Sequence, residues 1–92
     1  MNDNSQNLEI ARKRLLWRAT HRGIKEMDLI VGGFAMARLN AMDNSQLAEF
    51  AELLELPDQQ LLAWVTQQET VPENQRSDML TDMLSFRPEI LK

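Results

Sequence analysis

The residues of this chain best suited to molecular recognition are concentrated in one short stretch of mixed charge. The stretch reads Arg22-Gly23-Ile24-Lys25-Glu26-Met27-Asp28. A glycine at a helix end can adopt a positive φ without a Cβ clash, so we expect Gly23 to end one helix and turn the chain. Arg22 would then lie in the last turn of that helix and Glu26 in the first turn of the next, where each charge suits the helix dipole. The same side chains could instead face a partner protein, and their spacing alone leaves both interpretations open.

Residues for catalysis are sparse in this chain. An enzyme should show a nucleophile with a base, a metal cluster or a cofactor motif. The chain has no cysteine and a single histidine, His21. The serines Ser45, Ser77 and Ser85 are scattered along the sequence and do not indicate a dyad with that histidine. We therefore predict a protein that is not an enzyme and has neither a metal site nor a cofactor of its own.

The charge of the chain is −4 overall and is unevenly distributed. From Glu9 to Lys25, six lysines and arginines stand against one acid, whereas from Asp43 to Asp82 nine acids stand against Arg76 alone. Proteins that bind nucleic acid nonspecifically usually carry an excess of positive charge, so the net acidity argues against that class. The basic first segment nevertheless leaves open a contact with DNA or another anionic surface.

The termini and the hydropathy pattern bear on location. The first residues lack the basic and apolar regions of a signal peptide and the arginine-rich character of a transit peptide. No apolar run is long enough to cross a bilayer. We therefore expect a cytoplasmic protein without membrane insertion.

Helical periodicity runs through most of the chain and predicts one all-α domain, a small five-helix bundle over residues 1–92. We expect an ordered core over about residues 8–86, with a flexible polar N-terminus and a flexible C-terminal tail. The predicted helices span about residues 8–21, 24–39, 45–56, 59–67 and 73–86. Asp43 with Gln46 has the spacing of a capping box, and Asp58 after Pro57 is a plausible cap for the fourth helix.

The second predicted helix is apolar nearly all round, so we expect it to be central and buried on more than one side. Its Gly32-Gly33 pair predicts a close helix approach or a kink, because glycine lowers helix stability by roughly 1 kcal/mol relative to alanine. Trp17 lies at the edge of the apolar stripe of the first helix, where packing and a place at the rim of a binding surface are both open.

Several segments together resemble the succinate dehydrogenase assembly factor 2 family of flavinylation factors, whose signature is Arg-Gly-x-x-Glu. The likeness covers about residues 10 to 70 and rests on Arg14-Leu15-Leu16-Trp17, Arg22 to Leu29, Phe34-Ala35, Leu53-Leu54, Pro57-Asp58 and Trp64-Val65. One departure is Ile24, where the family often has methionine, a volume-conserving change. The segment after Pro72 matches only in being helical.

This resemblance implies an assembly factor that binds the flavoprotein subunit of succinate dehydrogenase, and in some bacteria that of fumarate reductase. It would promote covalent attachment of FAD, which belongs to the client, to a client histidine. By motif position, Arg22, Gly23 and Glu26 carry over as contact residues, with Arg22 pairing with a client carboxylate or carbonyl. Further candidates for the contact surface are Lys25, Asp28 and Trp17. We expect a monomer in the bacterial cytoplasm that binds no nucleic acid.

An antitoxin-like regulator is the alternative, because some members of this family have been described in that way. Such a protein would contact DNA or a toxin through the basic first helix. The net acidity and the lack of a second basic helix favour the flavoprotein as partner.

Overall fold

The computed structural model describes residues 4–87 of the chain, and within that range all regular structure is helical. The α-helices are α1 (Asn4–Thr20), α2 (Lys25–Arg38), α3 (Asn44–Leu53), α4 (Asp58–Val65) and α5 (Asp78–Ser85). Two short 3-10 helices, η1 (Leu39–Ala41) and η2 (Glu73–Gln75), lie between them. The predicted all-α fold of five helices is thus confirmed. None of the described helices is long and apolar enough to cross a membrane.

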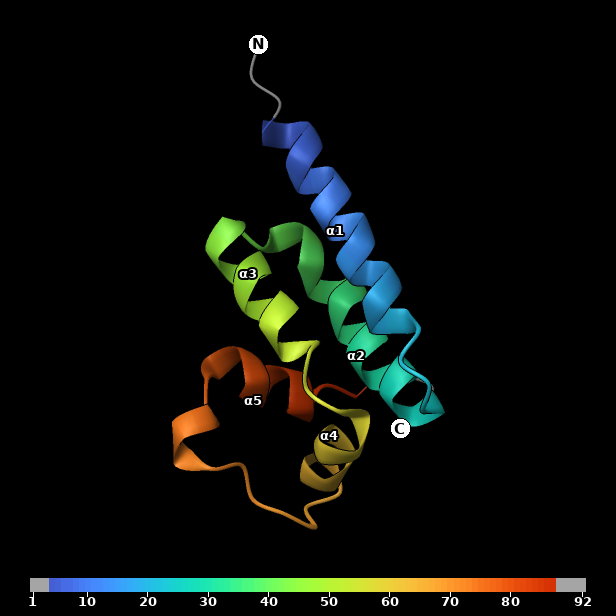
Figure 1. The fold of residues 1–92 in the computed structure, drawn as a ribbon, viewed down its shortest axis with the longest axis vertical. Helices are drawn as coiled ribbons and strands as arrows, with labels where there is room; N and C mark the ends of the chain where they lie inside the picture. The colour runs from blue at the N-terminus through green and yellow to red at the C-terminus, as the bar shows by residue number, and fades with distance from the viewer. Residues whose placement is uncertain (1–3, 88–92) are drawn as a thin grey trace.

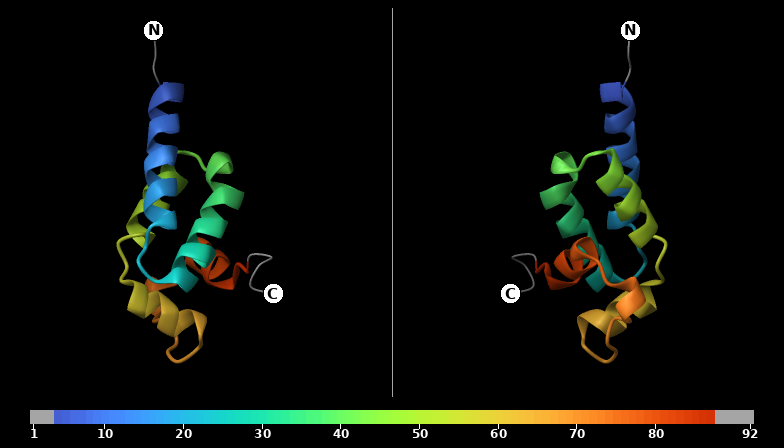
Figure 2. Two further views of the ribbon diagram at one scale, coloured as in Figure 1. Left: turned by 90° about the vertical axis from the view of Figure 1, so that its right-hand side faces the viewer. Right: turned by 90° about the vertical axis from the view of Figure 1, so that its left-hand side faces the viewer.

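Helix α2 lies at the centre of the molecule. It contacts α1, α4 and α5, while α3 contacts α1 and α5. Figure 1 shows α1, α2 and α3 side by side, with α4 and α5 at the end of the molecule opposite the start of α1. The views in Figure 2 show the first turns of α1 extending beyond the other helices. The predicted central role of this helix is confirmed.

One continuous apolar core joins the five helices. Its largest fully buried side chains are Met27, Val31, Phe34, Phe50, Leu61, Leu80 and Met83. The rings of Phe34 and Phe50 lie 5.8 Å apart and join α2 to α3. Phe86, just after α5, packs edge-on against Phe34 at 6.1 Å. The core therefore forms around α2, whose apolar residues face three other helices.

Some apolar residues lie outside this core. Met36 and Ala37 on α2 are exposed, Met36 by 73%, so α2 is not buried all round. Trp17 is 62% exposed, which rules out core packing as its role. Apolar character along a helix thus overstated how much of its surface is covered.

Helix boundaries follow the local capping chemistry. The predicted capping box is confirmed, because Asp43 accepts the Gln46 N–H at 2.8 Å and Gln46 Oε1 accepts the Asp43 N–H at 3.0 Å. The single helix predicted over 73–86 is wrong. Ser77 Oγ accepts the Leu80 N–H at 3.1 Å and starts α5 at Asp78, which separates it from η2.

The two ends of the chain bear on the predicted domain limits. Helix α1 already begins at Asn4, earlier than the predicted start near residue 8. Residues 1–3 and 88–92 lie outside the described part of the chain, so the flexibility expected of both ends stays a prediction there.

Gly32 allows α1 and α2 to approach closely. A Cβ built at this position would lie 2.8 Å from Thr20 Cγ2 and 3.4 Å from the Ala19 carbonyl oxygen. A separation of 2.8 Å is well inside van der Waals contact. The predicted close helix approach is therefore confirmed at Gly32.

We expect Gly32→Ala to destabilise the protein by about 1–3 kcal/mol, because the added methyl group forces apart two packed helices. Gly33→Ala is the matched control, since Gly33 is only half-buried. That change should be neutral or stabilise by up to about 1 kcal/mol through helix propensity. Urea denaturation of the two variants measures the difference, and equal stabilities would contradict the close approach.

Candidate functional site

The connection between α1 and α2, residues 21–24, forms a tight elbow. Gly23 has φ of +106°, a conformation that L side chains adopt only with strain. Ile24 returns to an extended conformation and precedes the first residue of α2. The predicted turn at Gly23 is confirmed. Arg22 lies in the elbow and not, as expected, in the last turn of the first helix, because α1 ends at Thr20.

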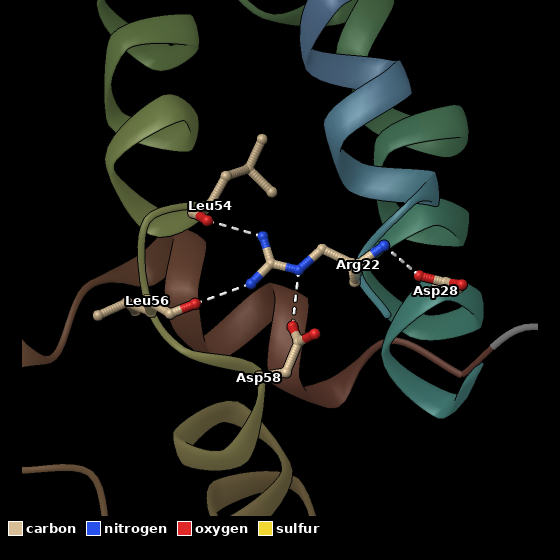
Figure 3. A network of polar contacts seen from close by, with 5 residues as sticks. All are labelled: Arg22, Asp28, Leu54, Leu56 and Asp58. Atoms are coloured by element: carbon tan, nitrogen blue, oxygen red, sulfur yellow. Dashed lines mark hydrogen bonds and ion pairs between the residues drawn. The ribbon is translucent and has the colours of Figure 1, made fainter. Parts of the chain in front are cut away.

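The guanidinium group of Arg22 points into the molecule and binds the connection between α3 and α4. Its Nε donates to Asp58 Oδ1, its Nη1 to the Leu54 carbonyl and its Nη2 to the Leu56 carbonyl, each at 2.7 Å (Figure 3). The side chain is only 8% exposed and that of Asp58 14%. Arg22 therefore satisfies carbonyls just past the end of α3 and pairs with the first residue of α4.

Asp28 anchors the elbow from the other side. Its Oδ1 accepts the backbone N–H of Arg22, which ties the first turn of α2 to the chain before Gly23 (Figure 3). With its backbone held by α2 and its side chain held by the α3–α4 connection, Arg22 fixes the elbow to three elements at once. Asp28 thus has an internal role too, although its half-buried carboxylate still borders the surface.

These contacts correct the expectation that Arg22 pairs with a client carboxylate or carbonyl. Three of its guanidinium N–H groups already have partners inside the chain, and the group is almost wholly enclosed. Binding a client would require those bonds to break. Asp58 is also not the expected cap of α4, because Pro57 precedes that helix without a side-chain cap and the carboxylate of Asp58 binds Arg22.

The other residues of the signature point outward. Gly23, Lys25 and Glu26 are exposed, and the two charged side chains make no hydrogen bond or ion pair with other residues of the described chain. Five exposed residues lie at the end of α1, in the elbow and at the start of α2, and we call them the elbow face: Trp17, His21, Gly23, Lys25 and Glu26. Its charged groups are free to meet a partner.

An aromatic stack continues the elbow face along the end of α1. The Trp17 and His21 rings lie 4.2 Å apart and are inclined by 11°. His21 Nδ1 lies 2.8 Å from the Trp17 carbonyl oxygen, which holds the imidazole against the indole. Both residues of the stack are exposed to solvent. The pairing of His21 with Trp17 was not predicted.

Much of the basic character of α1 is used inside the molecule. Arg12 donates to the carbonyls of Leu39 and Met42 at 3.1 and 2.7 Å. Arg18 pairs with Glu55 at 2.6 Å. With Arg22 also engaged, a large part of the charge that suggested DNA binding has internal partners. Among the described residues, no group of His, Cys, Asp or Glu side chains is arranged to hold a metal ion.

Comparison with known proteins identifies the family. A family model described as the flavinator of succinate dehydrogenase matches residues 13–87, most of the chain. The chain belongs to this family. The resemblance deduced from the Arg-Gly-x-x-Glu signature and its helical setting is therefore confirmed.

Members of the flavinator family from distant organisms match the same region. The chain is 37% identical to the FAD assembly factor SdhE of Acetobacter pasteurianus over 78 residues, which are 85% of this chain and 72% of that protein. It is 32% identical to the mitochondrial succinate dehydrogenase assembly factor 2 of Dictyostelium discoideum over 87% of this chain and 57% of that protein. The corresponding protein of Arabidopsis thaliana is 34% identical over 76% and 37% of the two chains. The chain thus spans only about half or less of the two eukaryotic relatives.

We expect Arg22→Met to destabilise the protein by about 3–5 kcal/mol, because it removes three hydrogen bonds and leaves the largely buried Asp58 carboxylate, 14% exposed, without its ionic partner. Arg12→Met is the matched control, since it removes a guanidinium that also binds two backbone carbonyls but pairs with no carboxylate. The control should lose only about 1–3 kcal/mol. Urea denaturation followed by circular dichroism measures both losses. An Arg22→Met loss no larger than that of Arg12→Met would contradict the internal role of Arg22.

Proposed function

We propose that the chain binds the flavoprotein subunit of succinate dehydrogenase through the elbow face and promotes covalent attachment of FAD to that subunit. Membership of the flavinator family supports this proposal. The choice of surface rests on one observation, which is that the signature residues differ in their orientation. Arg22 is locked inside, whereas Gly23 and Glu26 are presented outward on a fixed backbone.

The elbow can assist flavin attachment by positioning. Bond formation needs the isoalloxazine ring, the attacking group of the client and stabilising charges in one geometry, and holding them there lowers the barrier. A surface that is already rigid loses little entropy when it docks, so more of its binding energy is available to hold the client in that geometry. The chain would act in this way without a catalytic residue.

Each residue of the elbow face could make a different kind of contact with the client. Gly23 lets a client backbone approach without meeting a side chain. Glu26 would accept hydrogen bonds from a client cation or amide, with Lys25 as a second charged contact. The stacked Trp17 and His21 rings offer an apolar surface at the side of the contact, and aromatic anchors of this kind are common in protein interfaces.

The proposal extends to the client and to the state of the chain. FAD remains a group of the client, and this chain carries no cofactor of its own. The flavoprotein of fumarate reductase is a second client with the same chemistry. The chain acts as a monomer in the bacterial cytoplasm.

The antitoxin-like alternative depends on free positive charge along α1. Arg12, Arg18 and Arg22 are engaged internally, which leaves Lys13 and Arg14 as the exposed cations of that helix. Two cations on an acidic protein offer little affinity for DNA at physiological salt. The flavoprotein is therefore the better-supported partner.

Co-expression with the flavoprotein subunit tests the function directly. Covalent flavin remains attached in a denaturing gel, where its fluorescence reports the extent of incorporation. We expect the fluorescence per flavoprotein to rise several-fold when the chain is present. No increase, together with retention of the chain on heparin at physiological salt, would instead support the nucleic-acid alternative.

Glu26→Ala tests the elbow face within the same assay. Losing one hydrogen bond to a charged group costs roughly 1.5–3 kcal/mol, so we expect stimulation and affinity to fall by about tenfold or more. The control is Glu52→Ala, which removes an exposed carboxylate from α3 and should have no effect on either quantity. Equal activity of the two variants would remove Glu26 from the contact surface.

A further inference from the structure

We propose that Asp58 is a further client-binding residue, whose outer carboxylate oxygen, Oδ2, accepts a hydrogen bond from an N–H donor of the flavoprotein. This inference rests on the proposed function and adds a residue from the α3–α4 connection to the contact surface. It also gives Gly23 a second purpose, which is to leave Oδ2 open.

The two carboxylate oxygens of Asp58 differ in their surroundings. Oδ1 accepts the Nε–H of Arg22 at 2.7 Å. Oδ2 receives no hydrogen bond from the described residues. In that part of the chain, the buried side-chain polar atom without a partner is Trp64 Nε1, so Oδ2 keeps contact with solvent. Asp58 thus holds one oxygen inside the protein and offers the other at the surface.

Oδ2 lies beside Gly23. A Cβ built on Gly23 would lie 3.9 Å from this oxygen, which is ordinary van der Waals contact. A methyl group would therefore fit against the oxygen, and a longer side chain would cover it. Gly23 has no side chain, so a group of the client can approach the Asp58 carboxylate at this position.

Arg22 prepares Asp58 for this contact. The guanidinium is held by the carbonyls of Leu54 and Leu56 as well as by Asp58, so the carboxylate has a fixed orientation before any client arrives. Hydrogen bonds to a carboxylate are roughly twice as strong as those between neutral groups. A preorganised acceptor of this kind gains more on binding than a flexible surface carboxylate such as Glu26.

The variant Asp58→Asn isolates Oδ2. Arg22 has only donors, so the amide must turn its oxygen toward Arg22 Nε and its NH₂ group toward the surface. The internal hydrogen bond is kept, while the outer acceptor becomes a donor that opposes the client N–H. We expect affinity for the purified flavoprotein without covalent flavin to fall about tenfold or more, with incorporation of flavin falling in parallel. Surface-immobilised flavoprotein and interferometry measure the affinity.

Glu55→Gln is the matched control for charge. Glu55 is also paired with an arginine, Arg18, but it is 74% exposed and does not adjoin Gly23. It should bind the flavoprotein like the unmodified chain. Asp58→Asn binding as tightly as Glu55→Gln would overturn the inference. If the unmodified chain fails to bind or to stimulate, the proposed function itself fails, and the two failures are thereby distinguished.

Gly23→Asn provides a second test of access to Asp58 Oδ2 if Asp58→Asn does not fold. Asparagine tolerates a positive φ better than other residues with a side chain, but φ of +106° still strains it, so circular dichroism must first show that the variant folds. Its side chain would nevertheless cover Asp58 Oδ2, and we expect binding to weaken about tenfold, as in Asp58→Asn. A folded Gly23→Asn variant with unchanged affinity would contradict the open path to Oδ2.

Discussion

The hydrogen bonds of the Arg22 guanidinium group hold together segments of the molecule that are far apart in the chain. They tie the elbow between α1 and α2 to the end of α3 and the start of α4, elements that are distant in the sequence. Because the acceptors are two backbone carbonyls and a carboxylate, the interaction uses the planar fork of arginine, and lysine could not reproduce it. The elbow keeps one shape because this group is enclosed.

The signature of the family therefore serves two purposes in one short segment. Its arginine holds the elbow in place, and its glycine and glutamate are exposed in the elbow face. We propose that only the glycine and the glutamate touch a partner, and that the arginine acts by holding the elbow in place. A substitution at Arg22 and one at Glu26 are expected to fail for different reasons, the first by loss of stability and the second by loss of affinity.

The fold was largely predictable from local patterns. Five helices followed from apolar spacing, the turn at Gly23 from the need for positive φ, and the start of α3 from the Asp43–Gln46 pair. Each of these depends on residues within a few positions of one another. The elements η2 and α5 were predicted as one helix, because the sequence from Glu73 onward looks helical and gives no sign that Ser77 caps a new helix.

The candidate site was only partly predictable, because its decisive contacts are long-range. Arg22 and Asp58 are separated by 36 positions, and no local pattern indicates that they meet. The position of Arg22 between two helices suggested an exposed corner, and the fold instead places the α3–α4 connection against it. Exposure of Trp17 was likewise undecided by spacing, since it depends on which face of α1 the other helices cover. The sequence singled out this segment but did not show which of its residues face inward.

We propose that the flavoprotein contacts the elbow face, which the hydrogen bonds of Arg22 hold in place. Amide hydrogen exchange of the chain with and without the flavoprotein subunit tests this claim most directly. We predict slower exchange in the complex over residues 17–28, with the outer surface of α5 unchanged. Protection confined to α5, or the absence of protection around Gly23, would contradict the claim.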